Sequence, residues 1–173
     1  MQHTIIALVE DRPGVLSRIA SLFRRRGFNI ESLTVGHTEQ PGISRMTIVV
    51  DTNEVEAERV IAYMYKLVNV IQVEDLTNMT PMVRNLAMIK VLANDAKRTE
   101  IIQLVEIFRA RVVDVAQESL IIEITGTEDK IESFVNVLRP YGIIEMVRTG
   151  AVAMSRGSMA LSNAYVQDNI AVS

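Results

Sequence analysis

The sequence predicts an α+β protein made of two tandem βαββαβ units, each a single antiparallel sheet covered on one face by two helices. Two observations lead to this fold class, which is the ferredoxin-like arrangement. Short β-branched runs alternate with segments whose apolar residues recur at helical spacing, and the same order of elements then occurs a second time. The chain has 173 residues, of which 49% are hydrophobic but only 5% aromatic, so two small domains with aliphatic cores are expected.

The first unit is predicted over residues 1–77. Its first helix should bury one stripe, formed by Val15, Ile19, Leu22 and Phe23 at i, i+4, i+7 and i+8. Gly27 ends that helix, and Asn53 can cap the second helix with Glu56 at the capping-box position. Strands are predicted at 4–10, 28–36, 44–51 and 68–74, with a hairpin loop at 37–42.

The second unit is predicted over residues 78–157, after a polar joint at 77–82. Its strands are expected at 86–93, 112–116, 120–125 and 143–148. Its two helices should bury Ile101, Leu104, Val105 and Phe108, and Ile131, Phe134, Val135 and Leu138. Residues 158–173 form a tail without periodicity, which we expect to be loosely ordered.

The first strand predicts association between copies. Ile5, Ala7 and Val9 lie on one face of this strand and Ile6 and Leu8 on the other, so both faces are apolar. Two-sided apolar strands favour sheet-to-sheet or edge-to-edge contact, and we expect at least a homodimer.

Composition and motifs exclude most chemistry. The absence of cysteine removes disulfides, thiolate metal sites and a cysteine nucleophile. His3 and His37 have no metal-binding spacing and are interpreted as solvated, so we expect no catalytic residues and no metal site. Phosphate-binding glycine motifs are absent, and the run Arg24-Arg25-Arg26 is better explained by the helix dipole than by phosphate.

The same totals limit the partners and the location. A net charge of −3 disfavours nucleic acid. No signal peptide or membrane-spanning apolar run is evident, which predicts a cytoplasmic protein without membrane contact, although an organellar location stays open.

The segment between the first strand and the first helix has the chemistry of a site for a small zwitterion. A helix N-terminus offers free N–H groups to a carboxylate, Gly14 allows close approach, and Asp11 can accept from an ammonium group. Asn29 is expected beside this loop, with Ile30 and Leu33 shaping an apolar pocket. A plain strand-to-helix turn that uses Pro13 and Gly14 for conformation alone explains the segment equally well.

Two runs carry a family resemblance. D-R-P-G-V-L at 11–16 followed by G-F-N-I-E-S-L at 27–33 resembles the ACT domain, a βαββαβ module that commonly binds amino acids between paired copies. N-I-E-S-L-T-V at 29–35 and S-R-M-T-I at 44–48, with G-A-V-A-M-S-R-G at 150–157, are similar to the small regulatory subunit of acetolactate synthase. The similarity covers about residues 2–157, and the second unit resembles a further ACT-like module of that family.

The resemblance implies a regulatory rather than a catalytic chain. It would bind a catalytic subunit that carries thiamine diphosphate, magnesium and FAD, raise the activity of that subunit, and confer feedback inhibition, usually by valine, in branched-chain amino-acid synthesis. Gly14, Ser17, Asn29 and Ile30 match family positions around the effector, while Asp11 and Val15 are added from the predicted geometry. An amino-acid effector is a firmer expectation than valine itself.

Two alternatives belong to other classes of protein. A free-standing amino-acid sensor that regulates transcription would need a DNA-binding element, and neither a helix-turn-helix nor a basic ribbon is evident. A small enzyme on the same scaffold would need a convergent acid–base set, which the sequence does not indicate.

Overall fold

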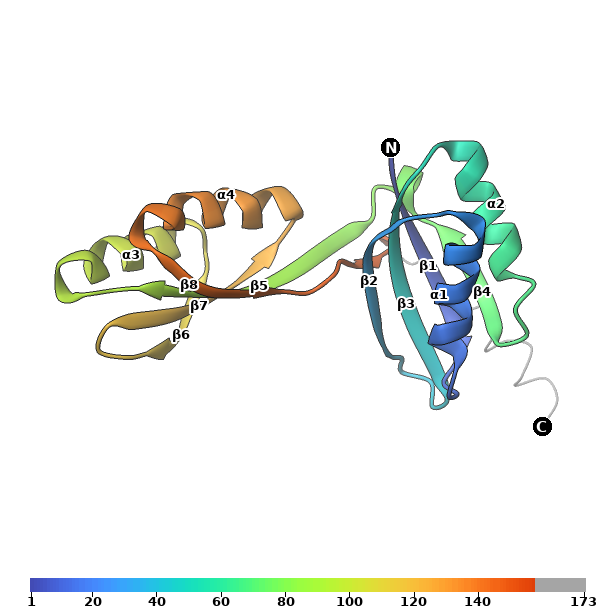
Figure 1. Ribbon diagram of the computed structural model, residues 1–173, viewed down its shortest axis with the longest axis horizontal. Coiled ribbons are helices and arrows are strands. Elements are labelled where there is room, and N and C mark those ends of the chain that lie inside the picture. Colours follow the sequence, from blue (N-terminus) through green and yellow to red (C-terminus); the bar gives the residue numbers. More distant parts are fainter. Residues whose placement is uncertain (158–173) are drawn as a thin grey trace. The chain divides into compact units, whose positions relative to one another are not determined.

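A computed structural model describes residues 1–157 and confirms the fold class, with two compact units in which two helices cover one face of an antiparallel sheet (Figure 1). The N-terminal unit comprises Met1–Met82 with the segment that begins at Ala153, and the C-terminal unit comprises Val83–Val152. The predicted tail at 158–173 lies outside the described residues.

The N-terminal unit has the predicted order of elements. These are β1 (Gln2–Glu10), α1 (Val15–Arg26), β2 (Ile30–His37), β3 (Ile43–Asp51), α2 (Glu54–Met64), β4 (Val70–Asp75) and the 3₁₀ turn η1 (Thr77–Met79). The sheet order is β2-β3-β1-β4, with antiparallel neighbours. The two central strands therefore carry most of the core, and β2 and β4 form the edges.

The core of this unit lies between the sheet and the helices, and it contains the whole predicted stripe of α1. Ala57, Val60 and Met64 of α2 are also buried, while Ile61 is only partly so. Asn53 caps α2 by accepting from the backbone N–H of Glu56 at 2.9 Å. The Glu56 carboxylate accepts from the Thr52 hydroxyl, so the return bond expected of a capping box is replaced by a contact one residue earlier.

The side of β1 that carries Ile6 and Leu8 was expected to be covered by a second copy, but it is already buried within one chain. Ile6 and Leu8 are 0% and 3% exposed in a single chain. On the same side of the sheet, the Arg45 guanidinium donates to the carbonyl of Ala153 at 2.7 Å, which holds the returning segment against this unit. The apolar residues on this face therefore do not by themselves require a second copy.

The two edge strands of this sheet, β2 and β4, differ in how free their outward-facing peptide groups are. The hydroxyl of Tyr65, just after α2, donates to the carbonyl of Val73 and accepts from its N–H, both at 3.0 Å. Both main-chain groups of Val73 point away from β1, so Tyr65 occupies part of the outer edge of β4. The β2 edge instead presents Val35, which is 42% exposed. Of the two edges, β2 is the better surface for strand pairing.

The C-terminal unit repeats the arrangement. Its elements are β5 (Met82–Leu92), α3 (Asp95–Ile107), β6 (Arg111–Val115), β7 (Ser119–Gly126), α4 (Glu128–Leu138), the 3₁₀ turn η2 (Arg139–Tyr141) and β8 (Ile143–Arg148). The short β9 (Val152–Met154) begins at the last residue of this unit and continues into the segment that belongs to the N-terminal unit. The sheet order is β6-β7-β5-β8, with β9 also paired to β5. Ile101 and Val105 of α3 are buried, Leu104 and Phe108 are partly buried, and all four predicted residues of α4 are buried.

The start of β5 is the main departure from the predicted elements. The strand begins at Met82, four residues before the predicted start at 86, and the expected polar joint is partly folded into η1. Pairing of β5 with β7 covers only Asn85–Leu92. The residues of β5 before Asn85 therefore extend beyond its pairing with β7. The short strand β9 also pairs with β5, and periodicity in the sequence did not predict it.

Candidate functional site

The N-terminus of α1 differs from that of the other three α-helices in the described part of the chain. Its cap residue is Gly14, in the left-handed region at φ 86°, and neither a side-chain cap nor an acidic residue occurs in its first turn. By contrast, α2, α3 and α4 are capped by Asn53, Asn94 and Thr127 and have acidic residues in the first turn. The positive end of the α1 dipole is thus left for an outside anion.

The loop before α1 is held by its backbone, which leaves a carboxylate at its surface. The Asp11 N–H donates to the carbonyl of Gly42 at 2.8 Å, so the loop is tied to the β2–β3 hairpin. The Asp11 carboxylate lies 3.3 Å from Nδ1 of His37, at the end of β2, and both side chains are exposed. His37 is therefore solvated as predicted, and it pairs with the carboxylate that we expect to accept from an ammonium group.

A polar chain beside this loop was not predicted. Arg18 of α1 donates to Oδ1 of Asn69 at 2.6 Å, and Nδ2 of Asn69 donates to Glu10 at 2.8 Å. The Glu10 carboxylate also lies 3.0 Å from Nε of Arg12. Asn69 is 8% exposed, and only its place in the family-like run Lys66–Val70 could have indicated it. The chain brings two guanidinium groups beside the start of α1, which favours a carboxylate there.

Two predicted residues of the first turn have different environments. The Val15 side chain is 5% exposed and belongs to the core, so only its main chain is left for a ligand. Its N–H points to the Arg12 carbonyl at a long 3.4 Å. Ser17 is exposed, on the next part of the same turn.

Asn29 and Ile30 do not lie beside this loop within one chain, and that prediction was wrong. Ile30 pairs with Val50, which also pairs with His3 near the start of β1. The loop follows Glu10, seven residues further along β1, which at about 3.3 Å per residue is about 20 Å away. Asn29 is exposed and donates to the Glu31 carboxylate at 2.6 Å, and Ile30 and Leu33 pack against the core. The error came from placing the start of β2 at the wrong end of the sheet.

The prediction that His3 is solvated was also wrong, because its side chain is buried, at 1% exposed. β1 begins at Gln2, so His3 lies inside a paired strand. Its Nδ1 is 2.7 Å from Asp75, which also accepts from the N–H and hydroxyl of Thr77. Partial burial acts to raise the pKa of Asp75, but the hydrogen bonds from Thr77 and His3 stabilise the carboxylate more, and the pKa lies below its usual value.

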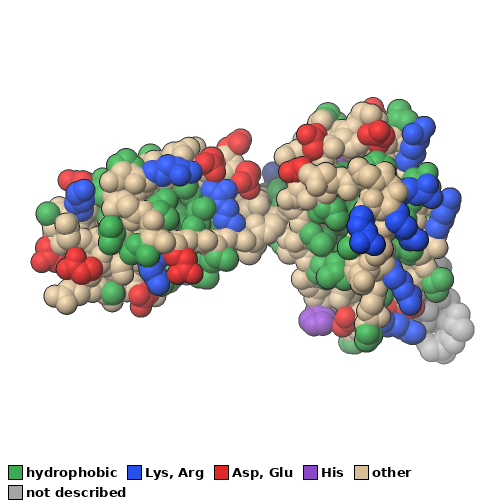
Figure 2. Space-filling view, in the orientation of Figure 1, with side chains coloured by type: hydrophobic (Ala, Val, Ile, Leu, Met, Phe, Trp, Pro, Cys, Tyr) green, Lys and Arg blue, Asp and Glu red, His purple; other side chains and the backbone are tan. Residues whose placement is uncertain are grey.

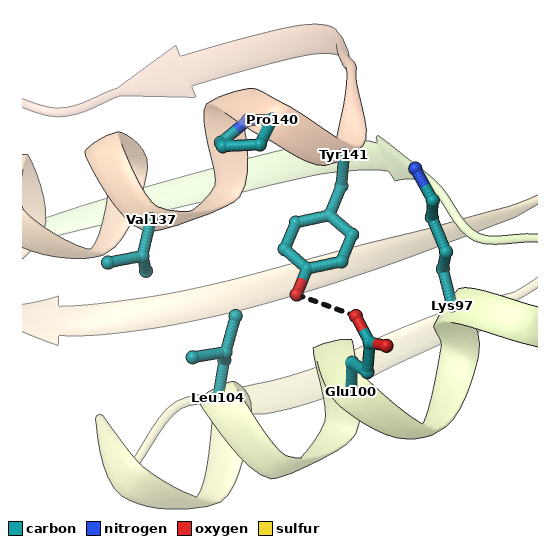
Figure 3. A pocket seen from close by; sticks show the side chains of 6 residues that line it. All are labelled: Lys97, Glu100, Leu104, Val137, Pro140 and Tyr141. Carbon is teal, nitrogen blue, oxygen red and sulfur yellow. Dashed lines mark hydrogen bonds between the residues drawn. The ribbon is translucent and has the colours of Figure 1, made fainter.

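The C-terminal unit contains a shallow groove between α3 and the end of α4 (Figure 3). The Tyr141 hydroxyl donates to the Glu100 carboxylate at 3.0 Å, which raises the pKa of Tyr141. Lys97 lies over the same ring, at 5.8 Å from its centroid. The remaining walls are Leu104, Val137 and Pro140. This groove has a charged end and an apolar end, but its polar groups already satisfy one another.

Within residues 1–157, no cluster of three or more His, Cys, Asp or Glu side chains is placed to hold a metal ion. No helix in this range is long and apolar enough to cross a membrane.

Comparison with known proteins agrees with this arrangement over both units. Residues 5–72 match the model of the AHAS small subunit-like ACT domain, and residues 84–157 match the small subunit of acetolactate synthase. A probable acetolactate synthase small subunit from Archaeoglobus fulgidus is 54% identical over 91% of this chain and 99% of its own. The acetolactate synthase small subunit from Mycolicibacterium smegmatis is 50% identical over 94% of this chain and 95% of its own.

A solved structure extends the agreement to three dimensions. The acetolactate synthase small subunit from Thermotoga maritima superimposes with a TM-score of 0.86 at 44% identity, over 92% of this chain and 99% of that chain. The fold and the N-terminal match define a regulatory protein of the ACT-domain class. The chain belongs to the family of acetolactate synthase small subunits.

Proposed function

We propose that this chain binds the catalytic subunit of acetolactate synthase in the cytoplasm, raises its activity and makes it subject to feedback inhibition by valine. The catalytic subunit would hold thiamine diphosphate, magnesium and FAD and form the acetohydroxy acids that lead to valine, leucine and isoleucine. The observation that carries the regulatory part is the α1 N-terminus, where Gly14 leaves a helix dipole without a protein cap inside a family-matched ACT domain.

The effector site that we propose uses this helix end for the carboxylate of the amino acid. Backbone N–H groups following Gly14, with Ser17 nearby, would hold the carboxylate, and the Arg18 guanidinium adds favourable charge. Asp11, exposed beside His37, would accept from the ammonium group. Val15 takes part through its main chain alone, because its side chain is in the core.

Asn29 and Ile30 would join the site from a second copy. If two chains pair at their β2 edges about a two-fold axis, the strands run antiparallel across the new junction, and the start of one β2 meets the end of the other. The end of β2 is His37, which lies 3.3 Å from Asp11. The two-fold therefore brings the Asn29 end of one chain to the Asp11–Gly14 loop of its partner.

Several features support this homodimer. The β2 edge carries the exposed Val35, whereas the Tyr65 hydroxyl bonds to the outward peptide groups of Val73 on the β4 edge. A pair of such sites, each built from both copies, would couple effector binding to the geometry of the dimer. Valine can shift the enzyme only if it binds one dimer arrangement better than the other, and a coupling of about 1–3 kcal/mol corresponds to a change of about 5–150-fold.

The test is acetolactate formation by the cognate catalytic subunit, with and without this chain, across a titration of valine. We expect a higher rate in the presence of the chain and inhibition by valine only when the chain is present. A parallel titration with leucine and isoleucine identifies the effector. A rate unaffected by the chain would contradict the proposed function, whereas activation without any amino-acid response would contradict the effector site alone.

A further inference from the structure

Five cations gather on the helical side of the N-terminal unit, where Figure 2 shows blue side chains over α1 and α2. We call this surface the α1–α2 basic face. It consists of Arg24, Arg25, Arg26, Arg59 and Lys66, all exposed. Within residues 1–157 none of them forms an ion pair with a carboxylate. The chain has more acidic than basic residues, 21 against 18, so this cluster is not a by-product of composition.

The basic face is organised around one aromatic ring. Arg59, Tyr63 and Lys66 follow one another at i, i+4 and i+7, which places them on one side of α2 and its continuation. The Arg26 guanidinium lies 4.0 Å from the centroid of the Tyr63 ring, and the Lys66 ammonium 5.1 Å. The stacked Arg26 is held in place before any partner arrives, which lowers the entropic cost of binding through it.

A hollow lies at the same place, lined by Arg26, Phe28, Glu56, Arg59 and Tyr63. Its single carboxylate, on Glu56, accepts from the Thr52 hydroxyl and forms no ion pair with Arg26 or Arg59, so two guanidinium groups face one carboxylate. The hollow therefore combines two aromatic side chains with an excess of positive charge. Arginine and tyrosine are the residue types that most often dominate the binding energy of protein interfaces.

Stability of the unit does not account for this cluster. The dipole of α1 favours Arg24, Arg25 and Arg26 in its last turn. The same reason fails for α2, which has no basic residue in its last turn, because Arg59 is in mid-helix and Lys66 lies beyond the end. Five cations from the two helices and the residues that follow them share a surface with one lining carboxylate, Glu56, and none of the five forms an ion pair within residues 1–157. This excess of positive charge is unfavourable within the chain and favourable against an acidic surface.

We propose that the α1–α2 basic face docks against an acidic surface of the catalytic subunit, an inference that rests on the proposed function. The cluster extends over two helices and includes aromatic side chains, which suits a protein surface better than a small anion. The net charge of −3 disfavours nucleic acid. The five residues of the basic face lie on α1, on α2 or just after α2, and none of them is on β2, so the proposed docking uses no residue of the β2 edge.

The experiment compares two double charge reversals with the same change in net charge. Arg25→Glu with Arg59→Glu alters the basic face. Arg84→Glu with Arg139→Glu is the matched control, because both arginines are exposed in the C-terminal unit and lack carboxylate partners among residues 1–157. Activation of the cognate catalytic subunit is measured against the concentration of each chain, at low and high salt, and valine binding to each isolated chain is measured by calorimetry.

We expect the first variant to need about tenfold more chain for half-activation and to lose most of the salt dependence seen with the wild type. The control should stay within about twofold of the wild type, and both variants should bind valine as the wild type does, which shows that the N-terminal unit is folded. Arg25→Gln with Arg59→Gln should give an intermediate value. Equal half-activating concentrations for both reversed variants, with an active wild type, would overturn the docking surface, whereas a wild type that activates nothing would overturn the proposed function itself.

Discussion

The two units share one topology but differ at the start of their first helices. In the N-terminal unit Gly14 precedes α1 without a side-chain cap, and four residues later Arg18 turns to Asn69 and its polar chain. In the C-terminal unit Asn94 accepts from the N–H of Lys97 at 3.1 Å, and four residues later Arg98 donates to three backbone carbonyls. One helix start has no side-chain cap, while the other is capped by Asn94.

This difference shows how a repeated fold divides its tasks. The carbonyls bound by Arg98 belong to Ala93, Ala116 and Gln117, so this arginine ties the β5–α3 turn to the β6–β7 hairpin. Arg18 donates instead to a side-chain oxygen, Oδ1 of Asn69. In the C-terminal unit the arginine at this position, Arg98, stabilises the unit itself. In the N-terminal unit the equivalent arginine, Arg18, lies next to the proposed effector site.

The largest expected effect comes from adding a charged side chain at the uncapped start of α1. Gly14→Asp places a carboxylate where the effector carboxylate would bind, and the space around the new Cβ is free. We expect the valine concentration for half-inhibition to rise more than about tenfold, with activation retained and a loss of about 1 kcal/mol in the free energy of unfolding from backbone strain. Inhibition curves measure the valine concentration for half-inhibition, and urea unfolding measures the free energy of unfolding.

Gly157→Asp is the control for strain, because Gly157 has φ 73° and open space as well. It should leave inhibition unchanged. A second experiment tests whether each proposed site combines Gly14 of one chain with Asn29 of its partner. Co-expression of Gly14→Asp and Asn29→Ala chains would then give mixed dimers with one intact site. Valine sensitivity should partly return in the mixed dimers. Its complete absence there would mean that both residues act within one chain.

A smaller effect is expected where the second unit uses its arginine for stability. Arg98→Met removes donors to three carbonyls, and the free energy of unfolding of the C-terminal unit should fall by about 2 kcal/mol. Arg18→Met should cost about half as much and should weaken valine binding. Urea unfolding followed by hydrogen exchange separates the two units. Equal losses with unchanged valine binding would remove the distinction between the two arginines.

The smallest effect concerns the last strands of the two sheets. β4 ends on Asp75, bonded to His3 and Thr77, whereas β8 ends on Arg148, which pairs with Glu128 and Glu132. Because the pKa of Asp75 is lowered in the folded state, its contribution is present above the unfolded pKa, about 3.9, and is lost as pH falls through the lower folded value.

Asp75→Asn should therefore reduce the free energy of unfolding by about 1 kcal/mol at pH 7 and make the decline below about pH 4 shallower. Unfolding of the N-terminal unit by urea at a series of pH values measures both. Glu74→Gln, one residue earlier on the same strand, is the control. Parallel pH profiles for wild type and Asp75→Asn would contradict the stabilising role of this carboxylate.

Local patterns predicted the elements better than the site. The stripes of α1 and α4 follow from spacing within a helix, and the αL glycine at the end of α1 is a local signal. The environment of His3 depends on a partner 72 residues away, and the polar chain through Asn69 depends on β4 lying beside β1. Periodicity within one segment contains no information about such pairs.

The candidate loop illustrates the same limit. Gly14 and Asp11 were predictable because helix ends and turns are encoded by neighbours, but Asn29 was assigned to the wrong end of the sheet. Its position follows from the direction of β2 against β3, which pairs Ile30 with Val50. Only the register shows that Asn29 lies far from the loop of its own chain.

The hydroxyl of Tyr65 on Val73 has a consequence for how large an assembly can become. Two sheets joined at β2 would form one continuous sheet whose two outer strands are both β4. Each outer strand would then carry the same phenol on its free peptide groups, so a third chain would find no comparable edge to extend. A third chain that paired with β4 would have to displace both hydrogen bonds of Tyr65 to Val73, so this phenol disfavours further growth of the N-terminal sheet through its outer strands.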